Sequence, residues 1–447
     1  MRNVIKLRKG LDIHLQGKAE ETRISLKSNG KFALVPDDFE GVTPKVVVKE
    51  GDMVKAGDAL FVNKLFPQMK FASPVSGKVT AIERGERRKV LCVRVDADKE
   101  QTYVDFGKKD VEKMDGQAVL EHLLEAGLLG YVNQLPYAVV ASPETPRTIF
   151  VSALRDKPLA CDFEYEVKGQ EADFQTGLTA LSKIAKVHLG VGVDSALTEM
   201  KNVEVTVFDG PCPAGNVGVQ VNHLEPVNKG EVVWTIGDPT VVLFIGRLFN
   251  TGKVDLRRLV AFCGSEVKKP CHVEMLVGEE LSTLVSNSYD ADHHVRIING
   301  NVLTGTKTSK DGFLGAHSSE ITIIPEGDDA DEFAGWIMPR LKQFSVNRSY
   351  FSWLMGKKKA YALDARVKGG ERHIIMSGEY DRVLPMDIYG EYLIKAIITG
   401  DIDKMEQLGI YEVSPEDFAL AEFVDSSKLE LQRIVREGLN NLRKENQ

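Results

Sequence analysis

Thr148-Ile-Phe-Val-Ser-Ala153 has the composition of a short, buried β-strand. A helical pattern follows over residues 174–184, where Phe174, Leu178, Leu181 and Ile184 fall on one face. Two further strands are expected over 187–191 and 203–208, with a short helix between them. Alternation of strands and helices predicts a parallel sheet with right-handed crossovers. The centre of the chain is therefore expected to be a Rossmann-like α/β domain, over residues 106–260.

The same domain is expected to include two more elements. Residues 118–126 predict a helix that ends at Gly127. The apolar run Val241-Val-Leu-Phe-Ile245 is interrupted by Gly246 and Arg247, and we interpret it as a buried strand.

The flanking regions have different patterns. Residues 1–105 contain short apolar runs separated by Gly, Asp and Pro, which is typical of strands and turns. Residues 261–328 return to short strands and predict a small α+β module. Residues 329–447 are expected to be mostly helical, with an N-cap at Ser414-Pro415 and a capping box at Ser427-Lys-Leu-Glu430. We therefore expect a multi-domain protein of mixed α/β and α+β class.

Composition narrows the classes of partner. The 447 residues carry a net charge of −8 and no dense Lys/Arg block, which argues against nucleic acid. The start of the chain lacks a signal-peptide pattern, and no run reaches the roughly 18 apolar residues that span a bilayer. The five cysteines have no C-x-x-C spacing and are expected to be reduced, buried thiols. A cytoplasmic protein that touches a membrane only from the side or through a partner is expected.

The most specific local pattern lies between residues 47 and 82. It includes Val48-Lys-Glu-Gly-Asp-Met-Val-Lys-Ala-Gly57 and Ala72-Ser-Pro-Val-Ser-Gly-Lys-Val79. These stretches resemble the flattened barrel of biotinyl and lipoyl carrier domains, a barrel-sandwich fold. Carriers place the modified lysine at the tip of an exposed hairpin, but only Phe71 and Ala72 separate Lys70 from the Ser-Pro turn. The loop tip is expected near 63–67, so we predict that Lys70 is unmodified.

Several short motifs carry weak signals. Gly190-Val-Gly-Val-Asp194 lacks the third glycine of a dinucleotide fingerprint, and no P-loop sequence occurs. His293-His294 has no third metal ligand nearby in sequence. We therefore expect no metal site and no catalytic residue in this chain.

Two segments are candidates for contact with other molecules. The turn Pro211-Cys-Pro-Ala-Gly215 follows a predicted parallel strand, at the sheet edge where open α/β sheets bind ligands. A purely structural turn is the alternative. The aromatic–basic segment, residues 348–361, is either a core segment or an exposed contact with a membrane protein or lipid headgroups. Its candidate contact residues are Tyr350, Phe351, Trp353, Leu354, Lys357 and Lys358.

Stretches spread along nearly the whole chain resemble one family. They include Lys9-Gly-Leu-Asp-Ile13, His223-Leu-Glu-Pro-Val227, Gly300-Asn-Val-Leu-Thr-Gly305 and Gly378-Glu-Tyr-Asp-Arg-Val-Leu-Pro-Met-Asp387. In order and spacing they look like the A subunit of the bacterial sodium-translocating NADH:quinone reductase. More distantly, the chain is similar to the C subunit of the Rnf complex and the flavin-bearing subunit of complex I. The resemblance implies a carrier-like barrel (1–105), a Rossmann-like domain (106–260), a β-grasp domain of the soluble-ligand-binding type, called SLBB (261–328), and a helical domain (329–447).

The distant relatives also indicate what this chain lacks. Where they carry a glycine-rich loop for flavin and NADH phosphates, this chain has Gly127-Leu-Leu-Gly-Tyr-Val-Asn-Gln-Leu-Pro136, with Tyr131 and Leu135 in place of glycines. Their iron–sulfur cysteines lie in the C-terminal part, and this chain has no Cys after Cys271. We therefore expect no cofactor in this chain, with flavins, iron–sulfur centres and NADH bound by partner subunits.

The resemblance implies a peripheral subunit on the cytoplasmic face of the bacterial inner membrane. It would contribute to quinone reduction, with ubiquinone or menaquinone as substrate, and to assembly with five other subunits, above all the membrane subunit that holds the quinone site. The isolated chain is expected to be inactive. The alternative is a pure scaffold without a quinone site.

Overall fold

A computed structural model describes residues 3–446 except 291, 329–336 and 357. Its central sheet has strand order β1-β14-β13-β12-β15-β10-β11. The first five strands in this order are parallel, and β10 and β11 close one edge in antiparallel pairing. The strands are β1 (Asn3–Lys6), β10 (Asn133–Leu135), β11 (Val139–Val140), β12 (Thr148–Ser152), β13 (Lys186–Val191), β14 (Glu204–Asp209) and β15 (Val233–Ile236). The predicted parallel sheet is confirmed.

Helices cover both faces of this sheet, as the alternation of side chains along β12 shows. Ile149 and Val151 join the apolar cluster that contains the buried faces of α3 and α5. Phe150 points the other way and packs with Val217 and Val221 of α4. The helices of this domain are α1 (Gly116–Glu125), α2 (Phe163–Val167), α3 (Glu171–Ile184), α4 (Val217–Leu224) and α5 (Thr240–Thr251).

The interpretation of Val241–Ile245 as a strand is wrong, because these residues belong to α5. The helix continues through Gly246 and Arg247 and ends at Gly252 in the left-handed conformation. Residues 240–249 are all buried, so the sequence shows no polar face that would reveal a helical period. Gly246 lets α5 approach α3 closely, since a Cβ there would lie 1.8 Å from the Asp173 carbonyl oxygen.

The N-terminal barrel consists of two antiparallel sheets whose core is continuous with that of the α/β domain. One sheet contains β3 (Lys31–Leu34), β5 (Met53–Val54), β8 (Gly77–Arg84) and β9 (Val90–Ala97), and the other β4 (Pro44–Val46), β6 (Ala59–Asn63) and β7 (Lys70–Ala72). Lys70 opens β7 and pairs with Val62 inside the sheet. The hairpin loop lies between Asn63 and Met69, whose backbone N–H and carbonyl bond at 3.0 Å.

The β-grasp module is a mixed sheet of order β19-β18-β20-β16-β17-β2. Its strands are β2 (Arg23–Ile24), β16 (Arg257–Cys263), β17 (Cys271–Leu276), β18 (Val295–Asn299), β19 (Thr306–Thr308) and β20 (Glu320–Pro325), beside a short helix, α6 (Ser282–Val285). The start of the chain crosses between domains: β1 pairs with β14 of the α/β sheet, and β2 pairs with β17 here. Residues 1–105 therefore do not all lie in the barrel, because the first strands complete sheets formed by later parts of the chain.

The C-terminal domain is helical from residue 380 onwards. It contains α7 (Tyr380–Val383), α8 (Gly390–Thr399), α9 (Ile402–Gln407), α10 (Ala419–Val424) and α11 (Leu431–Glu445). The predicted cap at Ser414-Pro415 is confirmed, with Asp417 completing a capping box. The box predicted at Ser427–Glu430 is wrong: the buried Ser427 hydroxyl instead bonds the backbone of His373 and Ile375. Leu431, Val435, Leu439 and Leu442 of α11 are fully buried.

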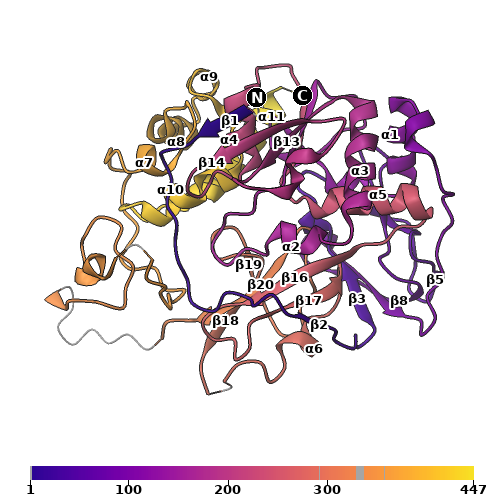
Figure 1. The fold of residues 1–447 in the computed structure, drawn as a ribbon, viewed down its shortest axis with the longest axis horizontal. Coiled ribbons are helices and arrows are strands. Elements are labelled where there is room, and N and C mark those ends of the chain that lie inside the picture. Colours follow the sequence, from indigo (N-terminus) through magenta and orange to yellow (C-terminus); the bar gives the residue numbers. More distant parts are fainter. Residues whose placement is uncertain (1–2, 291, 329–336, 357, 447) are drawn as a thin grey trace.

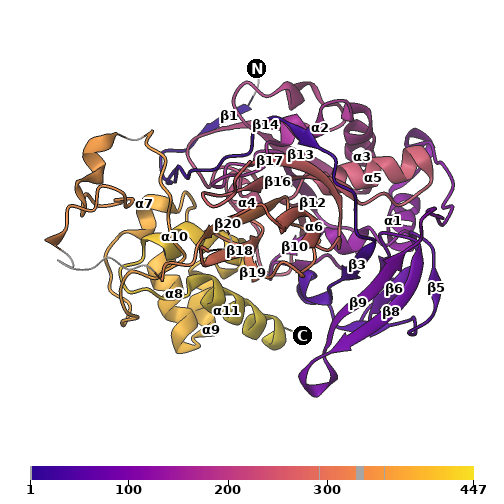
Figure 2. The ribbon, with the colours of Figure 1, turned by 90° about the horizontal axis from the view of Figure 1, so that it is seen from below.

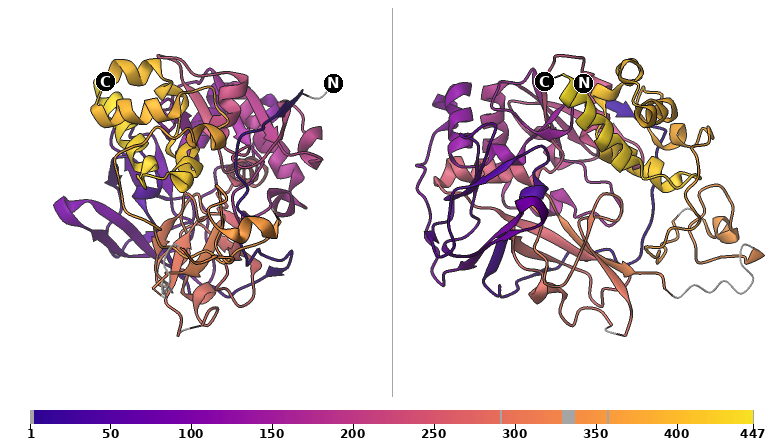
Figure 3. Two further views of the ribbon diagram at one scale, coloured as in Figure 1. Left: turned by 90° about the vertical axis from the view of Figure 1, so that its left-hand side faces the viewer. Right: turned by 180° about the vertical axis from the view of Figure 1, so that it is seen from behind.

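The described residues of 337–379, expected to be helical, form an irregular lobe that includes a short 3₁₀ helix, η7 (Phe351–Met355). Figure 2 shows this lobe and the barrel at opposite ends of the molecule. Figure 3 shows the helical domain beside the α/β domain, with the β-grasp module below both. None of the helices in the described part of the chain is long and apolar enough to span a membrane.

Candidate functional site

The candidate site is a cavity of about 400 Å³ where the α/β, β-grasp and helical domains meet. Segments that follow β12, β14 and β15 form one side of it, which is the carboxyl edge of the parallel sheet. Ligands of open α/β sheets bind at this edge because the loops there diverge and leave a crevice. Its lining includes Asp38, Tyr131, Arg155, Asp156, Lys157, Gly215, Asp238, His317 and Glu416.

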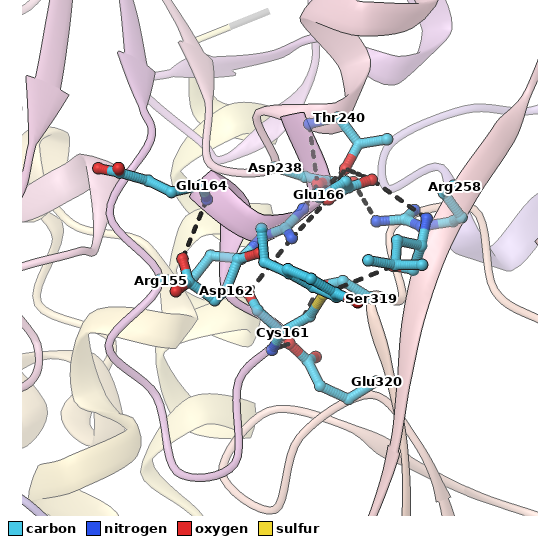
Figure 4. Close-up of polar contacts among 12 residues, drawn as sticks. Arg155, Cys161, Asp162, Glu164, Glu166, Asp238, Thr240, Arg258, Ser319 and Glu320 are labelled. Atoms are coloured by element: carbon cyan, nitrogen blue, oxygen red, sulfur yellow. Dashed lines mark hydrogen bonds and ion pairs between the residues drawn. The ribbon is translucent and has the colours of Figure 1, made fainter. Parts of the chain in front are cut away.

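A buried ion-pair network forms one wall of the cavity (Figure 4). Arg155, just after β12, donates to Glu166 at 2.7 Å and to Asp238 at 2.8 Å. Asp238, just after β15, also accepts from Arg258 of β16 at 2.8 Å. The Thr240 hydroxyl bridges Arg155 and Glu166 at the start of α5. The network therefore fixes the β-grasp sheet to the carboxyl edge of the α/β sheet.

Electrostatics keep this wall charged. Burial alone would raise the pKa of Asp238, but the guanidinium groups of Arg258 and Arg155 outweigh it and hold that pKa well below its usual range. Conversely, burial opposes the charge of Arg155, while Glu166 and Asp238 raise its pKa. The charges of Arg155 and Asp238 therefore compensate each other, and both groups keep their charge near neutral pH.

The lining of the cavity also includes a tyrosine whose hydroxyl is unpartnered. Tyr131 is buried, and its Oη has no hydrogen-bond partner among the described residues. The ring packs edge-on against Phe39 at 5.3 Å and lies 5.8 Å from the ring of His317. Burial and the Asp38 carboxylate raise the pKa of Tyr131, which keeps its hydroxyl proton in place as a donor. Buried polar groups without partners are rare and indicate a bound water or ligand.

Two titratable groups lie close to this hydroxyl. Burial raises the pKa of Asp38 to about 6, although the Ala316 N–H donates to its carboxylate at 2.9 Å. Burial lowers the pKa of His317, so its ring is neutral at neutral pH. Asp38 is thus a group at this cavity whose carboxylate takes up a proton at about pH 6.

The helical domain closes the cavity at Glu416. The Glu416 carboxylate pairs with the Lys157 ammonium of the α/β domain at 2.7 Å. Burial opposes the charge of Lys157, but Glu416 outweighs it and raises the pKa of the ammonium. Beside it, the Gly215 N–H donates to Asp156 at 2.8 Å. Lys157 and Glu416 are therefore paired with each other, and Asp156 is hydrogen-bonded to the backbone.

The residues of the predicted ligand turn lie in two different environments. Gly215 lines the cavity, whereas Cys212 and Ala214 are buried in the core of the helical domain. Burial raises the pKa of the Cys212 thiol, which rules against a thiolate there. Pro211 and Pro213 flank Cys212, and the Cys212–Pro213 peptide is cis. Of this turn, Gly215 alone is part of the cavity lining, and the role of the turn in ligand binding stays a prediction.

The other motifs lie away from the cavity. A Cβ at Gly190 would lie 2.1 Å from the Gln220 side chain, so this glycine serves packing. His293 contacts Glu266, and His294 contacts Asp328. Among the described residues no group of three or more His, Cys, Asp and Glu side chains could hold a metal ion. All five cysteines are buried and free.

The aromatic–basic segment is exposed at its tip. Phe351 is 59% exposed, Trp353 43% and Leu354 67%. Lys358 is exposed and Tyr350 half-buried, while Lys357 lies outside the described residues. Tyr361 at its end is buried and packs edge-on against the ring of Phe344. A second cavity of about 600 Å³ lies behind the segment and includes Tyr350 in its lining.

Sequence reasoning missed most of the cavity, including Asp38, Arg155, Lys157 and Asp238. One signal was available: Leu154-Arg-Asp-Lys and Gly237-Asp both place charged residues directly after a buried parallel strand. Asp38 and His317 gave no such signal, because they reach the cavity from other domains.

The fold and the cavity define a multi-domain α/β protein in which a Rossmann-like sheet is combined with a carrier-type barrel and a β-grasp module. Family models match three segments: the "NqrA N-terminal barrel-sandwich hybrid domain" at 5–98, the "NqrA second alpha/beta domain" at 114–254 and the "NQRA C-terminal domain" at 259–310. The expected fold class is thus confirmed.

Full-length relatives give the family. The chain is 34% identical to the A subunit of the Na(+)-translocating NADH-quinone reductase of Yersinia pestis bv. Antiqua, covering 99% of this chain and 100% of that protein. It is also 34% identical to the protein of the same name from Haemophilus influenzae (strain PittGG), over the same shares of the two chains. The chain therefore belongs to the family of Na(+)-translocating NADH-quinone reductase A subunits.

A solved structure of an NAD+-reducing [NiFe]-hydrogenase is similar over 77% of this chain and 67% of its own, with a TM-score of 0.35 and 11% identity. That likeness is too slight to support a functional argument.

Proposed function

We propose that this chain is a peripheral subunit of a sodium-translocating NADH:quinone reductase, on the cytoplasmic face of the bacterial inner membrane. Membership of the A-subunit family over the full chain carries the proposal. In such a complex, electrons pass from NADH through cofactors in five partner subunits to quinone, and sodium ions are expelled. Isolation of the complex from solubilised membranes, through a tag on this chain, tests the assembly.

We propose further that the chain binds no flavin or iron–sulfur centre of its own. The Tyr131 ring fills the space beside Phe39 and Phe244, at a position where flavin-bearing relatives are expected to have glycine. A side chain at this point keeps the backbone away from a phosphate group. The optical spectrum of the purified chain tests this: flavin or iron–sulfur absorption would contradict the proposal.

For the contribution to quinone reduction, we propose the interdomain cavity as the site of a quinone headgroup. A quinone carbonyl accepts hydrogen bonds and cannot donate them, so it needs a donor inside a largely dry pocket. The buried, unpartnered Tyr131 hydroxyl is such a donor, and its high pKa keeps the proton in place. Conversion of a quinone to a quinol takes up two electrons and two protons. Asp38, with its pKa raised to about 6, is positioned to hold one such proton.

The experiment is Tyr131→Phe in the purified chain, with short-chain ubiquinone and menaquinone analogues as probes. Loss of one hydrogen bond of about 1 kcal/mol predicts weaker binding by about fivefold. The matched control is Tyr103→Phe, because Tyr103 is exposed and lies over Lys253, away from the cavity. Equal Kd values for the two variants would exclude Tyr131 as the donor.

A pure scaffold is the alternative function. The buried network from Arg155 to Arg258 and the Lys157–Glu416 pair hold three domains together, as a docking platform requires. The absence of saturable quinone binding by the chain and by the assembled complex would favour the scaffold.

A further inference from the structure

The first part of the irregular lobe, residues 337–361, has an unusual charge for this chain. Six Lys or Arg residues and no Asp or Glu occur in these 25 positions, whereas the whole chain carries −8. Of these cations, Lys342, Arg348 and Lys358 are exposed. A strongly basic surface on an acidic protein indicates a partner of negative charge.

Apolar side chains are exposed on the same lobe. Ile337, Phe351, Leu354 and Met355 are 70, 59, 67 and 51% exposed, and Trp353 is 43% exposed. They belong to short, irregular segments around η7, and no neighbouring part of the described chain covers them. So many large apolar side chains close together on a surface indicate a contact site.

The base of the lobe, in contrast, is firmly held. Tyr361 is buried, and its N–H donates to the His14 carbonyl at 2.9 Å. Phe344 packs against the rings of Tyr361 and Phe423 at the edge of the helical domain. The exposed tip is therefore presented by an anchored base, standing away from the body of the molecule (Figures 1 and 2).

Charge and aromatic surface coincide at the tip. The Arg348 guanidinium lies over the Trp353 ring, 4.9 Å from its centre. An aromatic ring beside a cation matches the interface of a bilayer, where Trp lies at headgroup level and cations meet anionic lipids.

We infer that this lobe docks on the surface of an anionic lipid bilayer, with Phe351, Trp353 and Leu354 inserted between headgroups and Lys342, Arg348 and Lys358 among the phosphates. An acidic face on a protein would also attract the cations. A fluid bilayer suits this lobe better, because the exposed apolar side chains stand on a protruding tip that can enter between headgroups. The inference goes beyond the proposed function and does not depend on quinone binding.

The test is co-sedimentation of the full chain with vesicles of phosphatidylcholine alone, or mixed with an equal part of phosphatidylglycerol. Binding to the anionic vesicles is expected, and it should weaken with added salt. Each surface cation contributes about 1 kcal/mol, so Lys342→Gln with Lys358→Gln should lower the partition coefficient by about 25-fold. Phe351→Ser with Trp353→Ser should abolish most binding even at low salt.

Matched controls change the same residue classes elsewhere. Lys108→Gln with Lys109→Gln removes two exposed cations, and Met53→Ser with Leu65→Ser removes apolar side chains of 64 and 57% exposure from the barrel. These variants should bind vesicles as the unchanged chain does. Equal binding to both vesicle types, or equal binding by lobe and control variants, would overturn the inference. The lobe variants could instead bind vesicles as the unchanged chain does but fail to assemble with the other subunits. That result would overturn lipid docking and identify a protein as the partner of the lobe.

Discussion

The Arg155 guanidinium donates to Asp238 at 2.8 Å, and this contact joins the ends of the neighbouring strands β12 and β15. Because Asp238 also accepts from Arg258, the same carboxylate holds the β-grasp sheet in place. One wall of the cavity therefore depends on a single aspartate that belongs to no recognisable sequence motif.

Asp238→Asn should destabilise the fold by about 3 kcal/mol, because it leaves two buried guanidinium groups with less compensating charge. Urea denaturation followed by circular dichroism measures the change. The control is Glu231→Gln, which breaks the more exposed Arg147–Glu231 pair, with 32% exposure on both sides, and should cost less than about 1 kcal/mol. Equal losses would show that the network is not a structural link.

Asp38→Asn should stabilise the protein at about pH 8 by about 1–2 kcal/mol, and the gain should vanish at about pH 4. The folded-state pKa of about 6 lies above the ordinary value, so the folded protein binds this proton more tightly than the unfolded chain. Above that pKa the ionised Asp38 carboxylate therefore lowers the free energy of unfolding. This loss diminishes as the pH falls and the carboxylate takes up its proton. Asp37→Asn is the control, since Asp37 is exposed and pairs with Lys89. A pH-independent difference for Asp38→Asn would contradict the assignment.

Gly246→Ala should destabilise the protein by about 3 kcal/mol, the upper end of the range for overpacking. The added Cβ would lie 1.8 Å from the Asp173 carbonyl oxygen, and α5 could accept it only by moving away from α3. Thermal unfolding measures the loss. Gly370→Ala, with nothing within 4 Å of the new Cβ, should have little effect.

The intact mass of the native chain should equal that of its sequence, 49.5 kDa. Lys70 lies inside a strand pair, partly buried, and not at the tip of the hairpin where carrier-modifying enzymes reach their lysine. Mass spectrometry of the protein from its native host is the measurement. An added biotinyl or lipoyl group on Lys70 would contradict the structural argument.

The sequence by itself determined the local features of this protein. The strand at 148–153 and the helix at 174–184 follow from periodicity, which reflects which side chains each element must bury. The barrel followed from its turn residues, and the family from matches along the whole chain. Periodicity failed at Val241–Ile245, since a helix that is buried on all sides has no polar face.

The tertiary structure alone decided the candidate site. Asp38, Tyr131, Asp238 and His317 are far apart in sequence, and only the packing of domains brings them to one cavity. The same holds for β1 and β2, which complete sheets built by much later segments. Local pattern cannot specify such contacts, because their energy arises from burial and charge compensation between segments that meet only in the folded chain.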